Sequence, residues 1–165
     1  MSRSVIAVYP GTFDPITLGH EDIVRRAAAL FGEVIIAVAR AHHKKTLFTL
    51  DERLELARDT ASRYGNVKVE PFEGLVTEFV VARGGRAMVR GVRGVTDFDY
   101  EAQLAGMNRN LVSGVETVFL TPAATLQSIS STLVREISQL GGDVAPYVAP
   151  LVLKRLKDKR GAAAK

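Results

Sequence analysis

The chain contains no cysteine, and this absence excludes several kinds of chemistry. Without cysteine there is no disulfide framework, no thiolate nucleophile and no zinc–thiolate site. The sequence also lacks an N-terminal charged segment followed by an apolar core, and no apolar run approaches the length of a membrane span. These absences predict a soluble, cytoplasmic protein that does not interact with a membrane.

The net positive charge of the chain comes from its last residues. The 165 residues carry a formal net charge of +4 and a pI near 9.6, values that invite a nucleic-acid interpretation. Residues 154–165, however, carry a net charge of +5, so the rest of the chain carries −1 and is nearly neutral. We therefore expect no nucleic-acid partner, and we interpret the C-terminal run as a solvated helix face that ends in a flexible basic tail at residues 161–165.

Apolar β-branched runs alternate with segments of helical periodicity along the whole chain. This alternation predicts a Rossmann-like α/β fold: an open, five-stranded parallel sheet with helices on both faces, in a single domain over residues 1–160. The expected strands lie at residues 5–9, 34–39, 67–69, 87–89 and 115–120. The expected helices lie at residues 19–31, 51–64, 75–83, 100–111 and 131–140, with a last helix from Pro150. Thr49 and Glu52 fit a capping box at the start of the second helix, and Gly65 and Asn66 fit its end.

The turn after the first expected strand has the features of a phosphate site. That strand runs into Pro10 and Gly11, which turn the chain and let backbone approach a ligand, and His20 follows at the start of the next helix. The N-terminus of a helix presents free N–H groups and a positive dipole end to an anion. The imidazole of His20, charged or neutral near pH 7, adds a side-chain donor there.

A second glycine turn, residues 90–94, follows the fourth expected strand. Open α/β sheets bind ligands outside the carboxyl ends of their strands, where the strand order reverses. If the first and fourth strands are neighbours, Thr12, His20, Arg90 and Arg93 converge at that point. Arg90 ends a buried strand and needs an anionic partner, which a bidentate phosphate contact supplies.

For three other features, the neighbouring residues alone leave two possible roles open. Lys44 follows the second strand in a basic loop and is either solvated or a phosphate contact. Three consecutive hydroxyl residues at 130–132 open a helix and are either plain caps or an anion cradle. Glu101 follows acidic residues that favour the positive end of a helix dipole, and it either holds a turn or accepts hydrogen bonds from a ribose.

Together these segments resemble a known superfamily. The Gly-Thr-Phe-Asp-Pro run at residues 11–15, the Thr-x-Gly-His run at 17–20 and the Ile-Ser-Ser-Thr-x-x-Arg run at 129–135 resemble the nucleotidyltransferases with the (H/T)xGH signature. The block from Arg90 to Asn108 and the block at residues 44–53 look like the bacterial phosphopantetheine adenylyltransferases. The likeness extends from about Val5 to the last helix.

The resemblance implies an enzyme that transfers the adenylyl group of ATP to 4′-phosphopantetheine, giving dephospho-coenzyme A and pyrophosphate. It also implies Mg²⁺ as the cofactor, no protein metal ligands, and a homo-oligomer that is commonly a hexamer. The residues implied as catalytic are His20, Lys44 and Arg93. Those implied for 4′-phosphopantetheine are Thr12, Lys44, Val76 and Arg90. Those implied for ATP are Thr12, Phe13, His20, Gly91, Val92, Arg93, Glu101, Leu126, Gln127, Ser128, Ile129, Ser130, Ser131 and Thr132.

One segment departs from the family pattern. The family usually has an aromatic-x-Phe run before the Ile-Ser-Ser motif, where this chain has Leu126, Gln127 and Ser128. We therefore expect contacts from this loop to adenine to differ from those of the family. Two other interpretations stay open: a sister nucleotidyltransferase that acts on a mononucleotide or on a sugar or polyol phosphate, and a nucleotide-binding regulatory module with little turnover.

Overall fold

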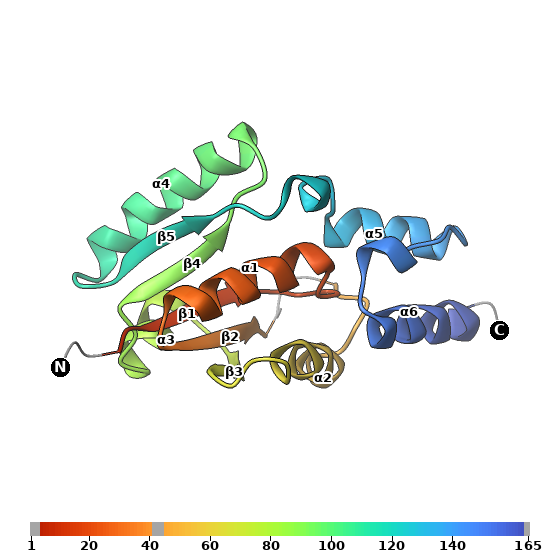
Figure 1. Ribbon diagram of the computed structural model, residues 1–165, viewed down its shortest axis with the longest axis horizontal. Helices are drawn as coiled ribbons and strands as arrows, with labels where there is room; N and C mark the ends of the chain where they lie inside the picture. Colours follow the sequence, from red (N-terminus) through yellow and green to blue (C-terminus); the bar gives the residue numbers. More distant parts are fainter. Residues whose placement is uncertain (1–3, 41–44, 164–165) are drawn as a thin grey trace.

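Alternating strands and helices form one parallel sheet in the computed structural model of the chain (Figure 1). The structure describes residues 4–40 and 45–163. The sheet has the strand order β3-β2-β1-β4-β5, with every neighbouring pair parallel. The strands are β1 (Ile6–Gly11), β2 (Glu33–Ala39), β3 (Val67–Phe72), β4 (Ala87–Gly91) and β5 (Glu116–Leu120). The expected Rossmann-like, five-stranded parallel sheet is confirmed.

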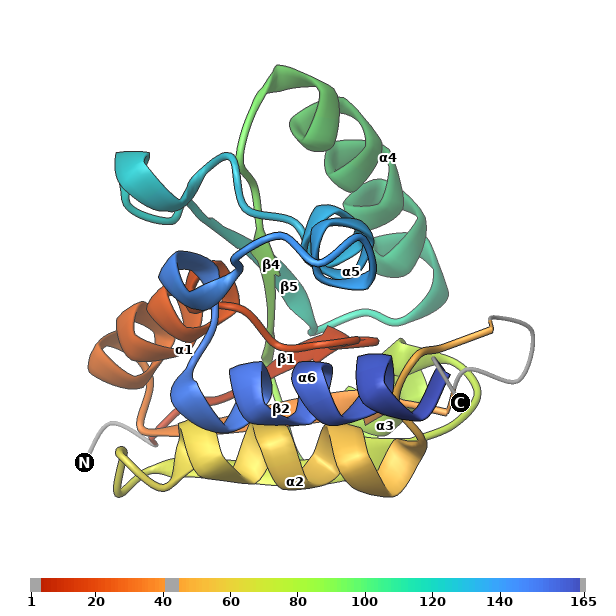
Figure 2. The same ribbon diagram turned by 90° about the vertical axis from the view of Figure 1, so that its right-hand side faces the viewer.

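The described part of the chain forms six α-helices. They are α1 (Leu18–Leu30), α2 (Leu50–Ala61), α3 (Val76–Ala82), α4 (Val95–Leu111), α5 (Ser131–Gln139) and α6 (Pro150–Ala163). Two short 3-10 turns, η1 (Ala124–Leu126) and η2 (Ala145–Tyr147), flank α5. Helices α1 and α2 lie on one face of the sheet, where Figure 2 shows α6 running alongside α2.

The core divides into two layers because successive strand residues point to opposite faces. On the α1 and α2 face, β1 contributes Ala7 and Tyr9, which pack among apolar residues of both helices, α5 and α6. On the other face, Val8 packs with Val80 of α3 and with Met88 of β4. These buried β-branched and aliphatic residues account for the near-continuous apolar strands expected of a parallel sheet.

Several boundaries differ from those expected from the sequence. Strands β1 and β4 extend as far as the first glycine of each turn, because Gly11 still pairs with Val38 and Gly91 with Leu120. Helix α4 begins at Val95, five residues earlier than expected, with Gly94 as its N-cap. The turns therefore emerge from the sheet edge itself, which fixes their backbone close to the site.

The end of α2 was also predicted wrongly. Its start is the expected capping box of Thr49 and Glu52, but the helix ends at Ala61 with Ser62 as the C-cap. Asn66 instead closes the neighbouring helix: its Nδ2 donates to the carbonyl of Ala28 at 2.9 Å and to that of Phe31 at 3.0 Å. A short amide side chain satisfies orphan helix carbonyls wherever the fold brings it to them.

The basic C-terminal helix is partly paired rather than only solvated. Arg155 lies 2.7 Å from Glu55 and Lys159 lies 2.9 Å from Glu52, so α6 meets the acidic side of α2. The helix includes residues 161–163 of the segment that we expected to be a tail. Ion pairs with acidic residues of α2 therefore hold the basic helix α6 against the rest of the protein.

Candidate active site

A cavity of about 460 Å³ opens at the carboxyl ends of β1 and β4. These strands pair directly, and the strand order reverses between them, so the expected adjacency is confirmed. Thr12, His20, Arg90 and Arg93 all line this cavity. The two glycine turns thus bring a hydroxyl, an imidazole and two guanidinium groups to one place.

Most of the residues predicted to bind a ligand belong to the cavity wall. The wall includes Thr12, Phe13, His20, Val76, Arg90, Gly91, Arg93, Glu101, Ile129, Ser130 and Ser131. It does not include Val92, Leu126, Gln127, Ser128 and Thr132. Lys44 lies outside the described residues. Contacts of any of these residues with a ligand stay predictions.

Glycine at position 11 is required by the ring of Phe13. A Cβ at Gly11 would lie 2.9 Å from the tip of that ring, closer than real Cβ contacts allow. Phe13 has a positive φ of 50°, which folds its ring back against the turn. The ring then meets both Tyr9 and His20 edge-on, with centroids 5.3 Å apart in each case. The turn therefore builds an aromatic support behind the imidazole.

Hydrogen bonds at the start of α1 select one tautomer of His20. Its Nδ1 lies 3.0 Å from the backbone nitrogen of Thr17, the N-cap residue, and 2.9 Å from the Thr17 hydroxyl. A backbone N–H can only donate, so Nδ1 must accept. In the neutral ring the proton then sits on Nε2, which leaves an N–H donor on that nitrogen.

The surroundings of His20 also keep the ring uncharged. Burial, assisted by the positive charge of Arg93, lowers the pKa of His20 from 6.5 to about 4. At neutral pH the ring is therefore a neutral donor, which decides between the two charge states left open by the sequence.

We expect His20 to stay neutral, with its proton on Nε2, from about pH 8 down to about pH 5.5. Two-dimensional ¹H–¹⁵N spectra of the imidazoles report the tautomer and titration, with the urea-unfolded chain as the reference. The pKa of His20 is near 6.5 in the unfolded chain and about 4 in the folded protein. The free energy of unfolding therefore decreases as the pH falls from about 6.5 towards about 4. A His20 signal that titrates near pH 6.5 in the folded protein contradicts the assignment.

Arg90 already has an anionic partner within the protein. Its Nε and Nη2 each lie 2.7 Å from a carboxylate oxygen of Glu101, a bidentate pair across the turn between β4 and α4. Burial by itself lowers the pKa of Arg90, but the hydrogen bonds and charge of Glu101 outweigh it and raise the pKa. Glu101 therefore holds the guanidinium at the cavity wall, and a ligand phosphate meets an arginine whose orientation is already set.

Arg93 connects the second glycine turn to the segment before α5. Its Nε donates to Asp97 at 3.0 Å and its Nη1 donates to the carbonyl of Ile129 at 2.9 Å. Ser130 caps α5 by accepting from the N–H of Leu133, and this confirms the capping interpretation of that residue. The N-terminus of α5 thus faces the same cavity as the N-terminus of α1.

Comparison with known proteins decides the family. The family model described as cytidylyltransferase-like matches residues 8–137. The chain is 71% identical over 160 residues to the phosphopantetheine adenylyltransferase of Acidovorax sp. (strain JS42), covering 97% of each chain. It is 57% identical over 157 residues to that of Ralstonia pickettii (strain 12J), covering 95% of this chain and 94% of the relative. The chain belongs to the phosphopantetheine adenylyltransferase family. The resemblance found in the sequence motifs is confirmed.

Solved structures support the fold at much lower identity. The nicotinic acid mononucleotide adenylyltransferase of Plasmodium falciparum, complexed with NaAD, superposes with a TM-score of 0.69 at 14% identity and covers 94% of this chain and 95% of that one. A lipopolysaccharide core biosynthesis protein of Thermoplasma volcanium superposes with a TM-score of 0.53 at 22% identity, covering 72% and 98%. The overall fold is therefore shared with these distant proteins.

The sequence analysis did not predict that Arg53 is buried and hydrogen-bonded to the backbone next to the cavity. Arg53 of α2 is only 2% exposed, and its Nη1 donates to the carbonyls of Thr12 and Ala39 at 2.8 Å each. It thereby ties the ends of β1 and β2 together beneath the cavity. The available signal was its spacing, since Arg53 falls on the apolar face of its helix between Leu50 and Leu54.

Tyr9 was also missed, because it sits inside a run that was interpreted only as a buried strand. Its side chain is 5% exposed, yet it lines the cavity beside Arg90 and Arg93. Burial raises the pKa of the Tyr9 hydroxyl, so this hydroxyl stays protonated at neutral pH. It is a neutral hydrogen-bonding group at the back of the site.

Neither a metal cluster nor a membrane span is found in the described part of the chain. Within residues 4–40 and 45–163, no group of three or more His, Cys, Asp or Glu side chains is placed to hold a metal ion. The helices in those ranges are too short or too polar to cross a bilayer. The carboxylates in the cavity wall, Asp97 and Glu101, are both paired with arginines.

Proposed function

We propose that the chain transfers the adenylyl group of ATP to 4′-phosphopantetheine, giving dephospho-coenzyme A and pyrophosphate. The observation that carries the proposal is the meeting of His20, Arg90, Arg93 and two helix N-termini around one cavity. Such a site suits the approach of one phosphate to another, where the barrier is the repulsion between two anions. The relatives named phosphopantetheine adenylyltransferase supply the acceptor.

In this mechanism the acceptor phosphate attacks the α-phosphorus of ATP in line with the departing pyrophosphate. The nucleophile is already an anion, so the reaction needs no serine, cysteine or general base. His20 donates from Nε2 to a non-bridging α-phosphate oxygen, where negative charge develops. A ring whose Nδ1 accepts from Thr17 and whose Nε2 carries the proton has no free nitrogen to act as a base.

The remaining positive groups divide between the two substrates. Arg90, held by Glu101, binds the phosphate of 4′-phosphopantetheine, and Val76, an apolar residue of the cavity wall, contacts the pantetheine arm. Arg93 and the N-terminus of α5 bind the phosphates of ATP. Lys44 completes this proposal as the cation that neutralises the attacking phosphate.

We propose that Mg²⁺ binds to the site together with ATP. Mg²⁺ keeps several waters and is commonly bound by substrate phosphates with few protein ligands. That preference fits a cavity whose carboxylates, Asp97 and Glu101, are already paired with arginines. When bound, the ion neutralises the triphosphate and the departing pyrophosphate, while the residues of the chain orient both substrates.

Pyrophosphate release measured with ATP, Mg²⁺ and different acceptors tests the function. Turnover with 4′-phosphopantetheine supports the proposal, and omitting the acceptor is the control. Turnover only with a mononucleotide or a sugar phosphate overturns it in favour of a sister nucleotidyltransferase. ATP binding without turnover for any acceptor overturns it in favour of a regulatory module.

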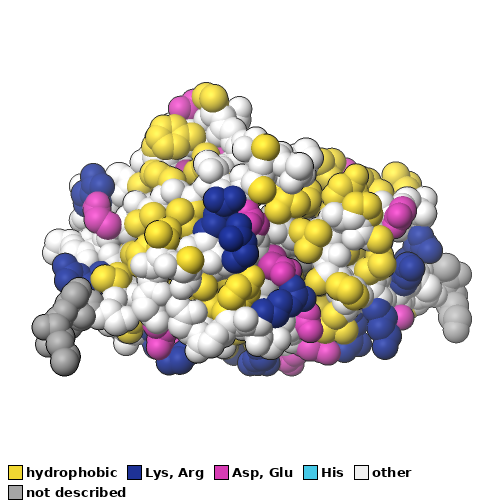
Figure 3. All heavy atoms as spheres, in the orientation of Figure 1, with side chains coloured by type: hydrophobic (Ala, Val, Ile, Leu, Met, Phe, Trp, Pro, Cys, Tyr) yellow, Lys and Arg dark blue, Asp and Glu magenta, His cyan; other side chains and the backbone are white. Residues whose placement is uncertain are grey.

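We also propose that the chain assembles as a homo-oligomer, of which a hexamer is the family form, through the outer face of α4. This helix buries only Glu101 and Asn108, whereas Tyr100 and Met107 are 65% exposed and Leu111 is 57% exposed. Figure 3 views the molecule from the side of α1, where charged side chains lie between the hydrophobic ones, so the outer face of α4 is on its far side. An apolar face of this kind on a helix that stands out from the sheet marks an interaction surface.

Replacing Met107 and Leu111 together with lysine is expected to shift the protein to monomers, because charge cannot be buried in the contact without a partner. Light scattering coupled to size exclusion measures the mass. Leu30→Lys, at the 64%-exposed end of α1, is the matched control and leaves the mass unchanged. A wild-type protein that is already monomeric overturns the proposal.

A cytoplasmic location is the last part of the proposal. A chain without cysteine has no disulfide to form in an oxidising compartment, and its proposed substrates are phosphorylated metabolites. Cell fractionation followed by detection of the untagged chain tests the location.

A further inference from the structure

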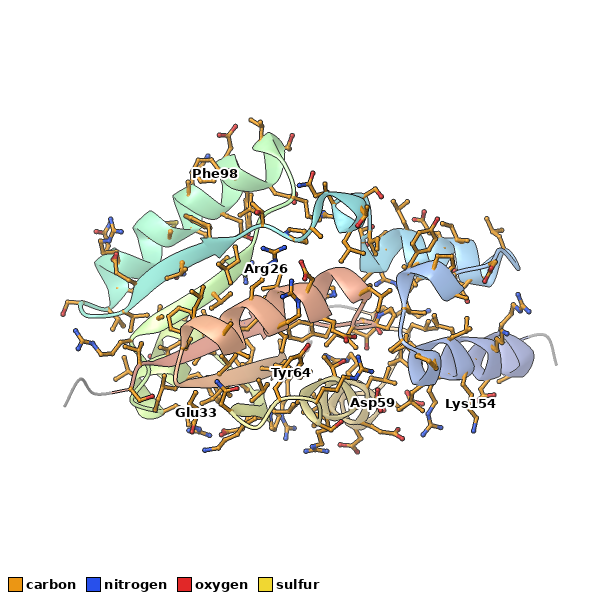
Figure 4. All side chains as sticks on the ribbon, viewed as in Figure 1. Arg26, Glu33, Asp59, Tyr64, Phe98 and Lys154 are labelled. Atoms are coloured by element: carbon orange, nitrogen blue, oxygen red, sulfur yellow. The ribbon has the colours of Figure 1, made fainter. Side chains whose placement is uncertain are left out.

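Asp22 of α1 makes a long-range contact that the proposed mechanism does not use. Its carboxylate is 8% exposed and accepts from Arg25 Nη2 at 2.6 Å and from Arg26 Nε at 2.9 Å. The same Oδ2 that binds Arg26 accepts from the backbone N–H of Ala123 at 2.8 Å. Figure 4 labels Arg26 on the side of α1 that faces β4 and β5. One carboxylate thus ties the first helix to the segment that follows β5.

Ala123 begins a chain of hydrogen bonds that leads to the cavity. Its carbonyl accepts from the N–H of Leu126 at 2.8 Å, and the Leu126 carbonyl accepts from the N–H of Ile129 at 3.2 Å. The Ile129 carbonyl in turn accepts from Arg93. Pro122, directly before Ala123, lines the cavity itself. The segment from Pro122 to Ile129 is therefore fixed at one end by Asp22 and at the other by Arg93.

The two arginines do not explain the position of Asp22 by themselves. Arg25 and Arg26 lie three and four residues further along the same helix, and their side chains are 57% and 38% exposed. Exposed pairs of this kind contribute little to stability. They hold the carboxylate in place and charged, while the contact with Ala123 is the one that joins separate parts of the fold.

We propose that Asp22 is a positioning residue for the nucleotide half of the site, acting by holding the segment from Pro122 to Ile129 through the Ala123 N–H. The proposal rests on the proposed function for the assignment of ATP to this half of the cavity and for the identity of the second substrate. A hydrogen bond to a charged carboxylate is stronger than a neutral one, so its loss lets this wall of the cavity move.

The ionisation of Asp22 agrees with this role. Burial alone raises the pKa of the carboxyl, but hydrogen bonds from Arg26, Arg25 and the Ala123 N–H outweigh it and lower the pKa to about 2. The carboxylate is therefore charged at every pH at which the enzyme is assayed, and it remains an acceptor for the backbone donor.

The test removes the contact from each side in the full chain. Asp22→Ala deletes the acceptor, and Ala123→Pro deletes the donor at a residue whose φ of −53° already suits proline. We expect each variant to raise the KM and Kd for ATP by about tenfold or more, the scale for losing a hydrogen bond to a charged group. The KM for 4′-phosphopantetheine stays within about twofold, and the double variant is no worse than either single one.

Two further variants separate positioning from a general loss of structure. Asp22→Asn keeps an oxygen that accepts from Ala123 and is expected to restore most of the ATP affinity. Asp59→Ala removes an exposed carboxylate of α2 that pairs with Arg63 at 3.5 Å, and this matched control leaves both KM values unchanged.

Titration calorimetry with ATP alone gives the Kd for ATP without turnover. This measurement therefore tests the role of Asp22 even if the acceptor is not 4′-phosphopantetheine. Unchanged Kd for ATP in Asp22→Ala and Ala123→Pro overturns the proposal. It is also overturned if both substrates lose affinity equally, or if Asp22→Asn is as weak as Asp22→Ala. Should Asp22→Ala not fold, Asp22→Asn and Ala123→Pro decide the question by the same measurements.

Discussion

Replacing His20 with alanine lowers kcat by at least about 10²–10³-fold, the scale for losing one oriented donor to a transition state. The KM for ATP changes little, because the charge that Nε2–H stabilises develops only as the phosphorus becomes pentacoordinate. Rapid measurement of pyrophosphate release under saturating ATP and acceptor gives kcat directly. Of the changes considered, we expect this one to have the largest effect on rate.

The identity of the replacement distinguishes a donor from a base. His20→Gln retains a neutral N–H donor and no basic nitrogen, so we expect it to recover part of the rate that alanine loses. Thr17→Val removes the hydroxyl that caps α1 but keeps the backbone N–H that donates to Nδ1 of His20. We expect it to lower kcat less than His20→Ala does. A His20→Ala enzyme with near-normal kcat would remove His20 from the catalytic residues.

Replacing Arg90 with alanine raises the KM for 4′-phosphopantetheine by about 10–150-fold, equivalent to about 1.5–3 kcal/mol for a charge-assisted contact. The same change leaves the Glu101 carboxylate buried without its partner, which costs about 3–5 kcal/mol of stability in comparable pairs. Steady-state kinetics with varied acceptor measures the first effect, and thermal unfolding measures the second.

A second substitution separates the two effects. In Arg90→Ala with Glu101→Gln, no charge is left unpaired, so thermal stability returns while the KM for the acceptor stays high. Glu101→Gln alone keeps Arg90 but loosens its orientation, so its KM lies between wild type and Arg90→Ala. If Arg90→Ala leaves both the KM and kcat for the acceptor unchanged, Arg90 does not bind the acceptor phosphate.

Local patterns were sufficient to place much of this site. Glycine turns after apolar strands mark backbone that leaves a parallel sheet at its carboxyl edge, but the pairing of β1 with β4 was only a condition until the structure showed it. The sequence could therefore bring His20, Arg90 and Arg93 together only on the condition that these two strands are neighbours. The capping box of Thr49 and Glu52 was equally predictable, because both partners lie within one turn.

Contacts between distant segments could not be predicted in the same way. Asn66 fits a local helix end, yet it bonds Phe31, 35 residues away, because α1 and the start of β3 happen to lie side by side. Asp22 resembles any surface aspartate next to arginines, and its bond to Ala123 crosses 101 residues. The charge and tautomer of His20 depend on burial and on one backbone N–H, neither of which a sequence motif specifies.

The most direct test of the account is the stereochemistry of transfer from ATP carrying a chiral sulfur substitution on the α-phosphate. In a single in-line displacement by the acceptor phosphate, the configuration at the α-phosphorus inverts, and this is the result we predict for dephospho-coenzyme A made by the chain. Retention of configuration would require two displacements, and so a covalent adenylyl intermediate on the protein. That result would contradict the assignment of His20 as a neutral donor.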